Sequence, residues 1–266
     1  MAKNKSYIKL EGTLDGLTFY QKDGQSFVKT KGGISKDRIL NDSNFKRTRE
    51  NMQEFAGAAR ASKAVRDAFA SVVKLMGDTY LAARLTGVMK KINRNGTGVR
   101  GERTIDLVSN TKLFQGFQFN PKDPLKSLFY APYDAPVFGA NRDSVTLEIA
   151  DFKADSFVTP PEGATHFTLV LASGLVSNFE YDANVEGYEP VDEDHNGKGL
   201  VAYSATFPVT GMVGADITLA NDFGLGAALP STVSHAAALG IIFYQEQNGA
   251  LYELASGNGM QVIAVG

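Results

Sequence analysis

Apolar and polar residues alternate in three short runs near the start of the chain, at positions 7–10, 17–21 and 27–31. Aromatic and β-branched residues are frequent in these runs, as is typical of strands. Asp23-Gly24 lies between the second and third runs and is a strong hairpin-turn signal. The pattern predicts a three-stranded antiparallel meander. Because the meander contains few large apolar residues, we expect it to need a further surface to pack on.

Residues 44–76 show a helical period instead. Gly77 and Asp78 indicate that this helix stops there and that a second one follows over residues 80–92. Most Lys and Arg side chains fall on the opposite faces, so the two helices are predicted to form a hairpin with a basic exterior. The predicted buried stripe of the first helix consists of Phe45, Met52, Phe55, Ala59, Ser62, Phe69 and Met76.

From residue 144 onward the pattern is that of strands alone, separated by turns rich in Gly and Asn. The runs are 145–149, 166–172, 200–207, 239–244, 250–254 and 260–265. Short strands at this spacing predict an antiparallel β-sandwich of immunoglobulin-like or jelly-roll type. The segment before them is crowded with aromatic residues and proline, and so many rings must be buried.

The chain is therefore predicted to be an α+β protein with four parts. These are a β-meander at 1–33, a basic helical hairpin region at 34–112, an aromatic and Pro-rich crossing segment at 113–143 and an acidic β-sandwich at 144–266.

Charge is distributed unevenly along the chain. Residues 1–126 contain 24 of the 27 Lys and Arg and 12 of the 29 Asp and Glu, a net charge of +12. Residues 127–266 contain the other 3 basic and 17 acidic residues, a net charge of −14. Opposite charges on one chain favour head-to-tail contacts, in which the basic part of one copy meets the acidic part of the next.

The basic face of the helices has two interpretations. Nucleic acid is one suitable partner, because each contact with a phosphate releases a counterion and gains affinity. Glu50, Glu54 and Asp67 are interspersed among the basic residues, as on a face that meets solvent or protein. A nucleic-acid-associated protein is therefore kept as the alternative function. The residues of this face are Arg47, Arg49, Arg60, Lys63, Arg66 and Lys74.

Motifs for catalysis are scarce. The chain has no Cys, and its three His are far apart in sequence, so neither a thiolate site nor a His-rich metal site is indicated. Residues 96–101 match the string G-x-G-x-x-G, but a helix precedes them and none is indicated after them, which favours a plain Gly-rich loop over a nucleotide site. We expect no enzymatic activity and identify no small-molecule substrate.

One loop has the spacing of calcium ligands. Asp192, Asp194 and Asn196, followed by Gly197, match the first half of a calcium-binding loop. The twelfth position, where a bidentate Glu belongs, is Tyr203. An acidic loop that ends in an Asn-Gly turn explains the same residues. Calcium is the one cofactor that the sequence leaves open.

Four short segments resemble a family of uncharacterised proteins common in Bacteroidota genomes. They are Gly16-Leu17-Thr18-Phe19-Tyr20, Lys31-Gly32-Gly33, Arg47-Thr48-Arg49-Glu50-Asn51 and Ala164-Thr165-His166-Phe167. That family combines an N-terminal Gly-rich β-hairpin, an Arg-rich helical stretch and a C-terminal β-sandwich, so the likeness covers most of the chain in order. The resemblance implies a bacterial or phage origin and no particular activity.

These features lead to the hypothesis of a structural subunit that assembles with copies of itself into a filament, tube or shell. A meander with an unpaired edge can add a strand from a neighbouring copy. The residues predicted to carry self-assembly are Tyr7, Leu17, Phe19, Tyr20, Phe27 and Val28.

The first residues include Lys but no apolar segment of a secretory signal, and no apolar run is long enough to cross a membrane. A cytoplasmic location and no membrane partner are therefore expected.

Overall fold

The computed structural model describes residues 2–5 and 8–266. The chain divides into two compact units, Met1–Arg49 and Glu50–Gly266. In the smaller unit, four strands form one antiparallel sheet in the order β1-β4-β3-β2. The elements of this unit are β1 (Ala2–Lys3), β2 (Gly12–Leu14), β3 (Leu17–Lys22), β4 (Gln25–Thr30), α1 (Lys36–Asn41) and η1 (Ser43–Phe45).

Two hairpin turns set the order of this sheet. The predicted turn at Asp23-Gly24 joins β3 to β4, and both of its residues have positive φ. Asp15-Gly16 forms a second turn of the same kind, so the residues directly before it, β2, pair with β3. The predicted strand at 7–10 is wrong for positions 8–10, which lie outside any strand. Tyr7 lies outside the described residues.

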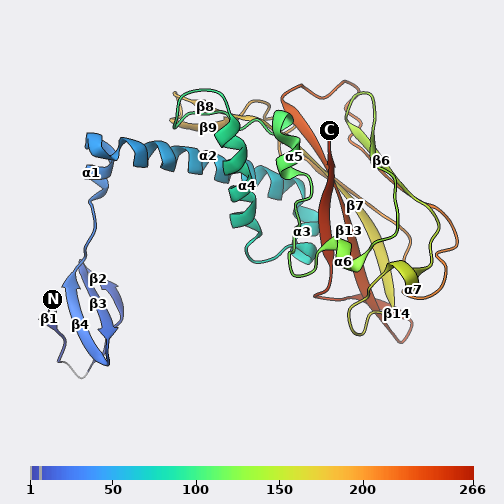
Figure 1. The fold of residues 1–266 in the computed structure, drawn as a ribbon, viewed down its shortest axis with the longest axis horizontal. Coiled ribbons are helices and arrows are strands. Elements are labelled where there is room, and N and C mark those ends of the chain that lie inside the picture. The colour runs from blue at the N-terminus through green and yellow to red at the C-terminus, as the bar shows by residue number, and fades with distance from the viewer. Residues whose placement is uncertain (1, 6–7) are drawn as a thin grey trace. The chain divides into compact units, whose positions relative to one another are not determined.

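The larger unit has three layers (Figure 1). Helices α2 (Lys46–Ala68), α3 (Ala70–Met76) and α4 (Leu81–Asn95) cover one face of a six-stranded sheet. The central strands of that sheet are β7 (His166–Ser177) and β13 (Val233–Gln247). A three-stranded sheet covers its other face. This arrangement confirms the α+β class with two facing sheets in the C-terminal part.

The six-stranded sheet runs in the order β10-β7-β13-β14, with β11 paired to β7 and β15 paired to β13, and the three-stranded sheet runs β12-β6-β5. Every predicted run contains a strand, while β5, β8, β9 and β12 were not predicted. The remaining strands are β5 (Val137–Phe138), β6 (Ser144–Ile149), β8 (Phe179–Asp182), β9 (Gly187–Pro190), β10 (Gly199–Tyr203), β11 (Phe207–Pro208), β12 (Ile217–Asp222), β14 (Ala250–Glu253) and β15 (Gly259–Val265).

Side chains of the two central strands alternate between two cores. In β7, Val170 and Ala172 face the helices, whereas Leu169 and Leu171 face the smaller sheet. β13 follows the same rule, so both strands are buried along most of their length. The crossing segment contributes to both cores, Phe119 to the first and Phe129 to the second. The short helix η2 (Val108–Asn110) precedes this segment, α5 (Thr111–Phe114) spans its start and α6 (Leu125–Leu128) lies within it, while α7 (Ala154–Phe157) follows β6.

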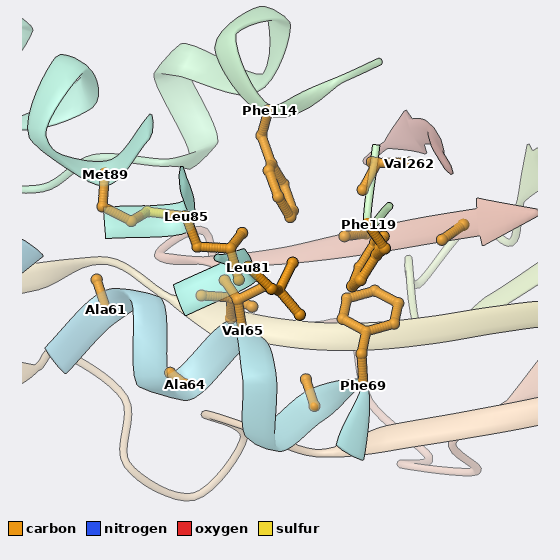
Figure 2. Close-up of a cluster of buried hydrophobic side chains, with 14 of the residues drawn as sticks. Ala61, Ala64, Val65, Phe69, Leu81, Leu85, Met89, Phe114, Phe119 and Val262 are labelled. Atoms are coloured by element: carbon orange, nitrogen blue, oxygen red, sulfur yellow. The ribbon is translucent and has the colours of Figure 1, made fainter. Parts of the chain in front are cut away.

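The predicted first helix is two helices, because the backbone leaves helical geometry at Phe69. The ring of Phe69 packs edge-on against Phe119, with centroids 5.3 Å apart, in the core that also contains Leu81 and Leu85 of α4 (Figure 2). The predicted buried stripe is wrong at Met52 and Phe55, which are 53% and 57% exposed. The buried face of α2 carries small residues instead, among them Ala58, Ala61, Ala64 and Ala68.

Small residues are required because α2 lies very close to the strands. A Cβ at Gly199 in β10 would collide with the carbonyl oxygen of Ala68, near the end of α2. A Cβ at Gly57 would enter the ring of Tyr188 in β9. Large apolar side chains do not fit between surfaces this close, which places Met52 and Phe55 on the other side of the helix.

One acidic residue on the buried face of α2 collects four hydrogen bonds. The Glu54 carboxylate is 2% exposed and accepts from Lys90 Nζ at 2.6 Å, from Arg103 Nε at 2.7 Å and Nη2 at 2.9 Å, and from the Gly101 backbone N–H at 2.9 Å. Most Lys and Arg of the helices were predicted to form a basic exterior, but the side chain of Lys90 is only 16% exposed. Gly101 ends the G-x-G-x-x-G string, which is therefore a loop that closes over a carboxylate.

The network extends to the β8–β9 hairpin. The Tyr188 hydroxyl donates to the carbonyl oxygen of Arg103 at 2.8 Å, and the Asn93 side chain donates to the same oxygen at 2.6 Å. Burial raises the pKa of Tyr188 to about 12. Burial alone would raise the pKa of Glu54 as well, but the hydrogen bonds from Arg103, Lys90 and Gly101 outweigh it and lower the pKa to about 2.

We predict that Glu54→Gln lowers the free energy of unfolding by about 3 kcal/mol, because it leaves Lys90 and Arg103 buried without their counter-charge. The ionised Glu54 stabilises the fold above its ordinary pKa of 4.5, and this contribution is lost as the pH falls from 4.5 toward about 2. Urea denaturation at neutral and acidic pH measures both effects. The matched control is Glu193→Gln in an exposed loop. Equal stability of the two variants at neutral pH would contradict the assignment.

A second prediction concerns the close approach of α2 to β10. Gly199→Ala is expected to cost about 2 kcal/mol or more, because the added methyl group must displace the carbonyl of Ala68. Gly87→Ala is the matched control, since a Cβ at this exposed position in α4 meets nothing within 4 Å, and it should stabilise the helix by about 0.5 to 1 kcal/mol. Thermal unfolding followed by circular dichroism checks both, and opposite signs are the expected result.

Candidate interaction surface

The smaller unit lacks a hydrophobic core within its described residues. Its one buried side chain there is that of Ser26, and the first buried apolar side chain along the described chain is Ala58, in the larger unit. Leu14 and Leu17 are 65% and 40% exposed. A sheet that carries exposed apolar side chains, as this one does at Leu14 and Leu17, is the clearest candidate site for contact with another molecule.

One face of this sheet is apolar. The register pairs Leu14 with Leu17 and Phe19 with Val28, and directly paired residues point to the same side of a sheet. Residues two apart along a strand also share a side, so Leu17 and Phe19 lie together. The four side chains form a continuous patch, which we name the apolar patch. Leu14 was not predicted as part of it, although the Asp15-Gly16 turn marks its strand.

The opposite face of the sheet is aromatic and basic. The rings of Tyr20 and Phe27 stack with their centroids 5.6 Å apart, and Lys29 Nζ lies 5.3 Å from the centre of the Tyr20 ring. The hydroxyls of Thr13 and Thr18 lie 3.1 Å apart on this side. The predicted self-assembly residues are thus divided between the faces: Leu17, Phe19 and Val28 on one, and Tyr20 and Phe27 on the other.

One edge of the sheet is formed by β2. In the described part of the chain, this strand pairs with β3 alone, so its outer backbone groups face no strand. An edge of this kind is a template for pairing with another chain. The apolar patch extends to this edge through Leu14.

Several residues of the predicted basic face contact other groups of the same chain. Arg49 donates to the carbonyl oxygens of Ile39 and Asp42 at 2.8 and 2.9 Å. Arg60 forms an ion pair with Glu189, and Lys63 forms one with Asp67 at 2.7 Å. Arg66 is partly buried, Arg47 lies on exposed helix surface, and Lys74 lines a groove beside α3. Arg49, Arg60 and Lys63 thus bind protein groups of the same chain.

The loop with calcium-like spacing uses its side chains for its own backbone. Asp192 accepts from the backbone N–H of His195 at 2.9 Å, and the ring nitrogen Nδ1 of His195 lies 2.8 Å from the same carboxylate. Asn196 accepts from the N–H of Ser177 at 3.1 Å, while Asp194 is exposed. Among the described residues, no group of three or more His, Cys, Asp or Glu is placed to hold a metal ion. The geometry is that of a hydrogen-bonded turn.

No family model, curated protein or solved structure matches this chain. Among the helices that the structure describes, none is both long and apolar enough to cross a membrane.

Proposed function

We propose that this protein is a non-enzymatic structural subunit that assembles with copies of itself into a filament, tube or shell. The observation that supports the proposal most strongly is the apolar patch of the smaller unit, with its adjoining open edge at β2. A partner that covers this patch removes Leu14, Leu17, Phe19 and Val28 from water and supplies the layer that the sheet lacks.

Charge favours a second copy of the chain as that partner. The smaller unit contains 11 Lys and Arg against 5 Asp and Glu, a net charge of +6. The larger unit contains 16 basic and 24 acidic residues, a net charge of −8. Attraction between the smaller unit of one copy and the larger unit of the next is heterologous, and a heterologous contact propagates into rings or open helices.

We predict that Leu14→Ser combined with Leu17→Ser weakens assembly by about tenfold or more, because burial of a leucine is worth about 1.5 to 3 kcal/mol. Size-exclusion chromatography with light scattering measures the mass against the 28.6 kDa of one chain. The matched control is Val185→Ser with Val191→Ser, at two exposed positions of the larger unit. A wild-type chain that stays at 28.6 kDa at high concentration would refute the proposal.

A further prediction concerns salt. Individual exposed ion pairs contribute only about 0 to 1 kcal/mol, so charge should govern the rate and register of assembly while apolar contacts supply cohesion. Raising the salt concentration from about 0.05 M to about 0.5 M shortens the screening length about threefold and should slow assembly. Turbidity or light scattering after dilution into each buffer gives the rates. Equal rates across this range would exclude the electrostatic contribution.

The excess of basic residues in the smaller unit also suits the second candidate function, binding of nucleic acid. A mobility-shift assay with a DNA probe at low and high salt separates the two functions. A salt-sensitive shift by a chain that remains monomeric would favour nucleic-acid binding. Assembly without any shift would favour the structural subunit.

A further inference from the structure

The larger unit has an apolar groove on the helix side of its main sheet. The groove has a volume of about 380 Å³. Val72, Leu75 and Met76 of α3 form one wall, and Ile242 of β13 and Tyr203 of β10 line the sheet side.

The groove continues to an open strand edge. Glu253 of β14 lines it, and the register of β14 with β13 places Leu251 on the same side of the sheet as Glu253 and Glu246. All four residues of β14 are exposed, and in the described part of the chain β14 pairs with β13 alone. An apolar groove therefore adjoins an unpaired backbone edge, which is the combination that strand addition requires.

The surroundings of this edge are acidic. The chain contains no Lys or Arg after Lys198, while Glu246 and Glu253 lie on the groove side of the edge. Lys74 is the one basic residue among those that line the groove. A basic occupant with an apolar face and its own strand edge fits this surface.

We propose that β14 and the adjoining groove are the receptor for the N-terminal sheet of a second copy of this chain, with β2 of that copy pairing with β14. This inference rests on the proposed self-assembly and specifies its contact. Pairing of β2 with β14 joins the four-stranded sheet of one copy to the six-stranded sheet of the next. In the register that places Leu14 beside Leu251, the apolar patch extends the apolar surface of the groove.

The arriving sheet brings positive charge to this acidic edge. Lys3, Lys22 and Lys29 lie on the face of the small sheet opposite the apolar patch, so in this register they attract Glu246 and Glu253 through the overall field of the sheet and not as direct pairs. Lysines on an edge sheet discourage indiscriminate pairing. Glu246 and Glu253 therefore favour pairing of the basic sheet with the β14 edge over pairing between two basic sheets.

Site-directed crosslinking tests the pairing, since the chain has no Cys of its own. Two single-Cys chains of different mass, Thr13→Cys on β2 and Tyr252→Cys on β14, are mixed at a concentration that permits assembly and treated with a short bismaleimide. Val185→Cys, in the turn between β8 and β9, replaces Tyr252→Cys in the control mixture. Val185 and Tyr252 are 58% and 59% exposed. We expect about tenfold more heterodimer from the β2–β14 pair than from the control pair, because pairing raises the local concentration of the two thiols.

Light scattering on the wild-type chain distinguishes the two levels of failure. Equal crosslinking of both mixtures by a chain that assembles would overturn the β14 receptor and leave self-assembly standing. A chain that stays monomeric would refute both. A second variant probes the charge: Glu253→Lys should reduce the heterodimer several-fold, while the exposed control Glu193→Lys should not. If Glu253→Lys keeps the full yield of crosslinked heterodimer, the acidic residues of the β14 edge do not contribute to the contact.

Discussion

The Glu54 carboxylate joins segments of the larger unit that are far apart in sequence. Its hydrogen bonds to Lys90, Arg103 and Gly101 fix α4 and the loop after it against α2. A buried carboxylate is tolerated only when its partners are all in place, so the network admits one arrangement of these segments. Helix α2 can bring Glu54 to this position because its buried face carries Gly57 and alanines, which let it lie close to the strands.

The two units differ in how completely they bury their own apolar side chains. In the larger unit, the central sheet is covered by helices on one face and by a second sheet on the other, and its long strands are buried. The described residues of the smaller unit include no buried apolar side chain, although its sheet carries Leu14, Leu17, Phe19 and Val28 on one side. The gain from burying such a surface is the physical argument for the proposed role of the smaller unit in assembly.

Local patterns in the sequence predicted most elements, because the period of apolar residues distinguishes strands from helices. The same patterns were misleading for the buried face of α2. The predicted stripe followed large residues such as Met52 and Phe55, which are exposed, whereas the short distance between helix and strands leaves room only for alanine and glycine. Glu54 could not be told from Glu50 or Asp67 by sequence, since its partners Lys90 and Arg103 are distant along the chain. Strand β2 could have been predicted, because the sequence contains the Asp15-Gly16 turn signal that follows it. The open edge at β14 could not, because the sequence does not show which strands pair.

In the proposed assembly, the N-terminal sheet of each copy is completed by a neighbouring copy. Electron cryomicroscopy of the full-length chain, at a concentration where light scattering shows assembly, is the decisive measurement of this contact. We expect density for residues 8–30 against the larger unit of an adjacent copy, with the small sheet continued by strands of that copy. Density for these residues on the larger unit of their own copy, or copies that touch only through their larger units, would contradict it.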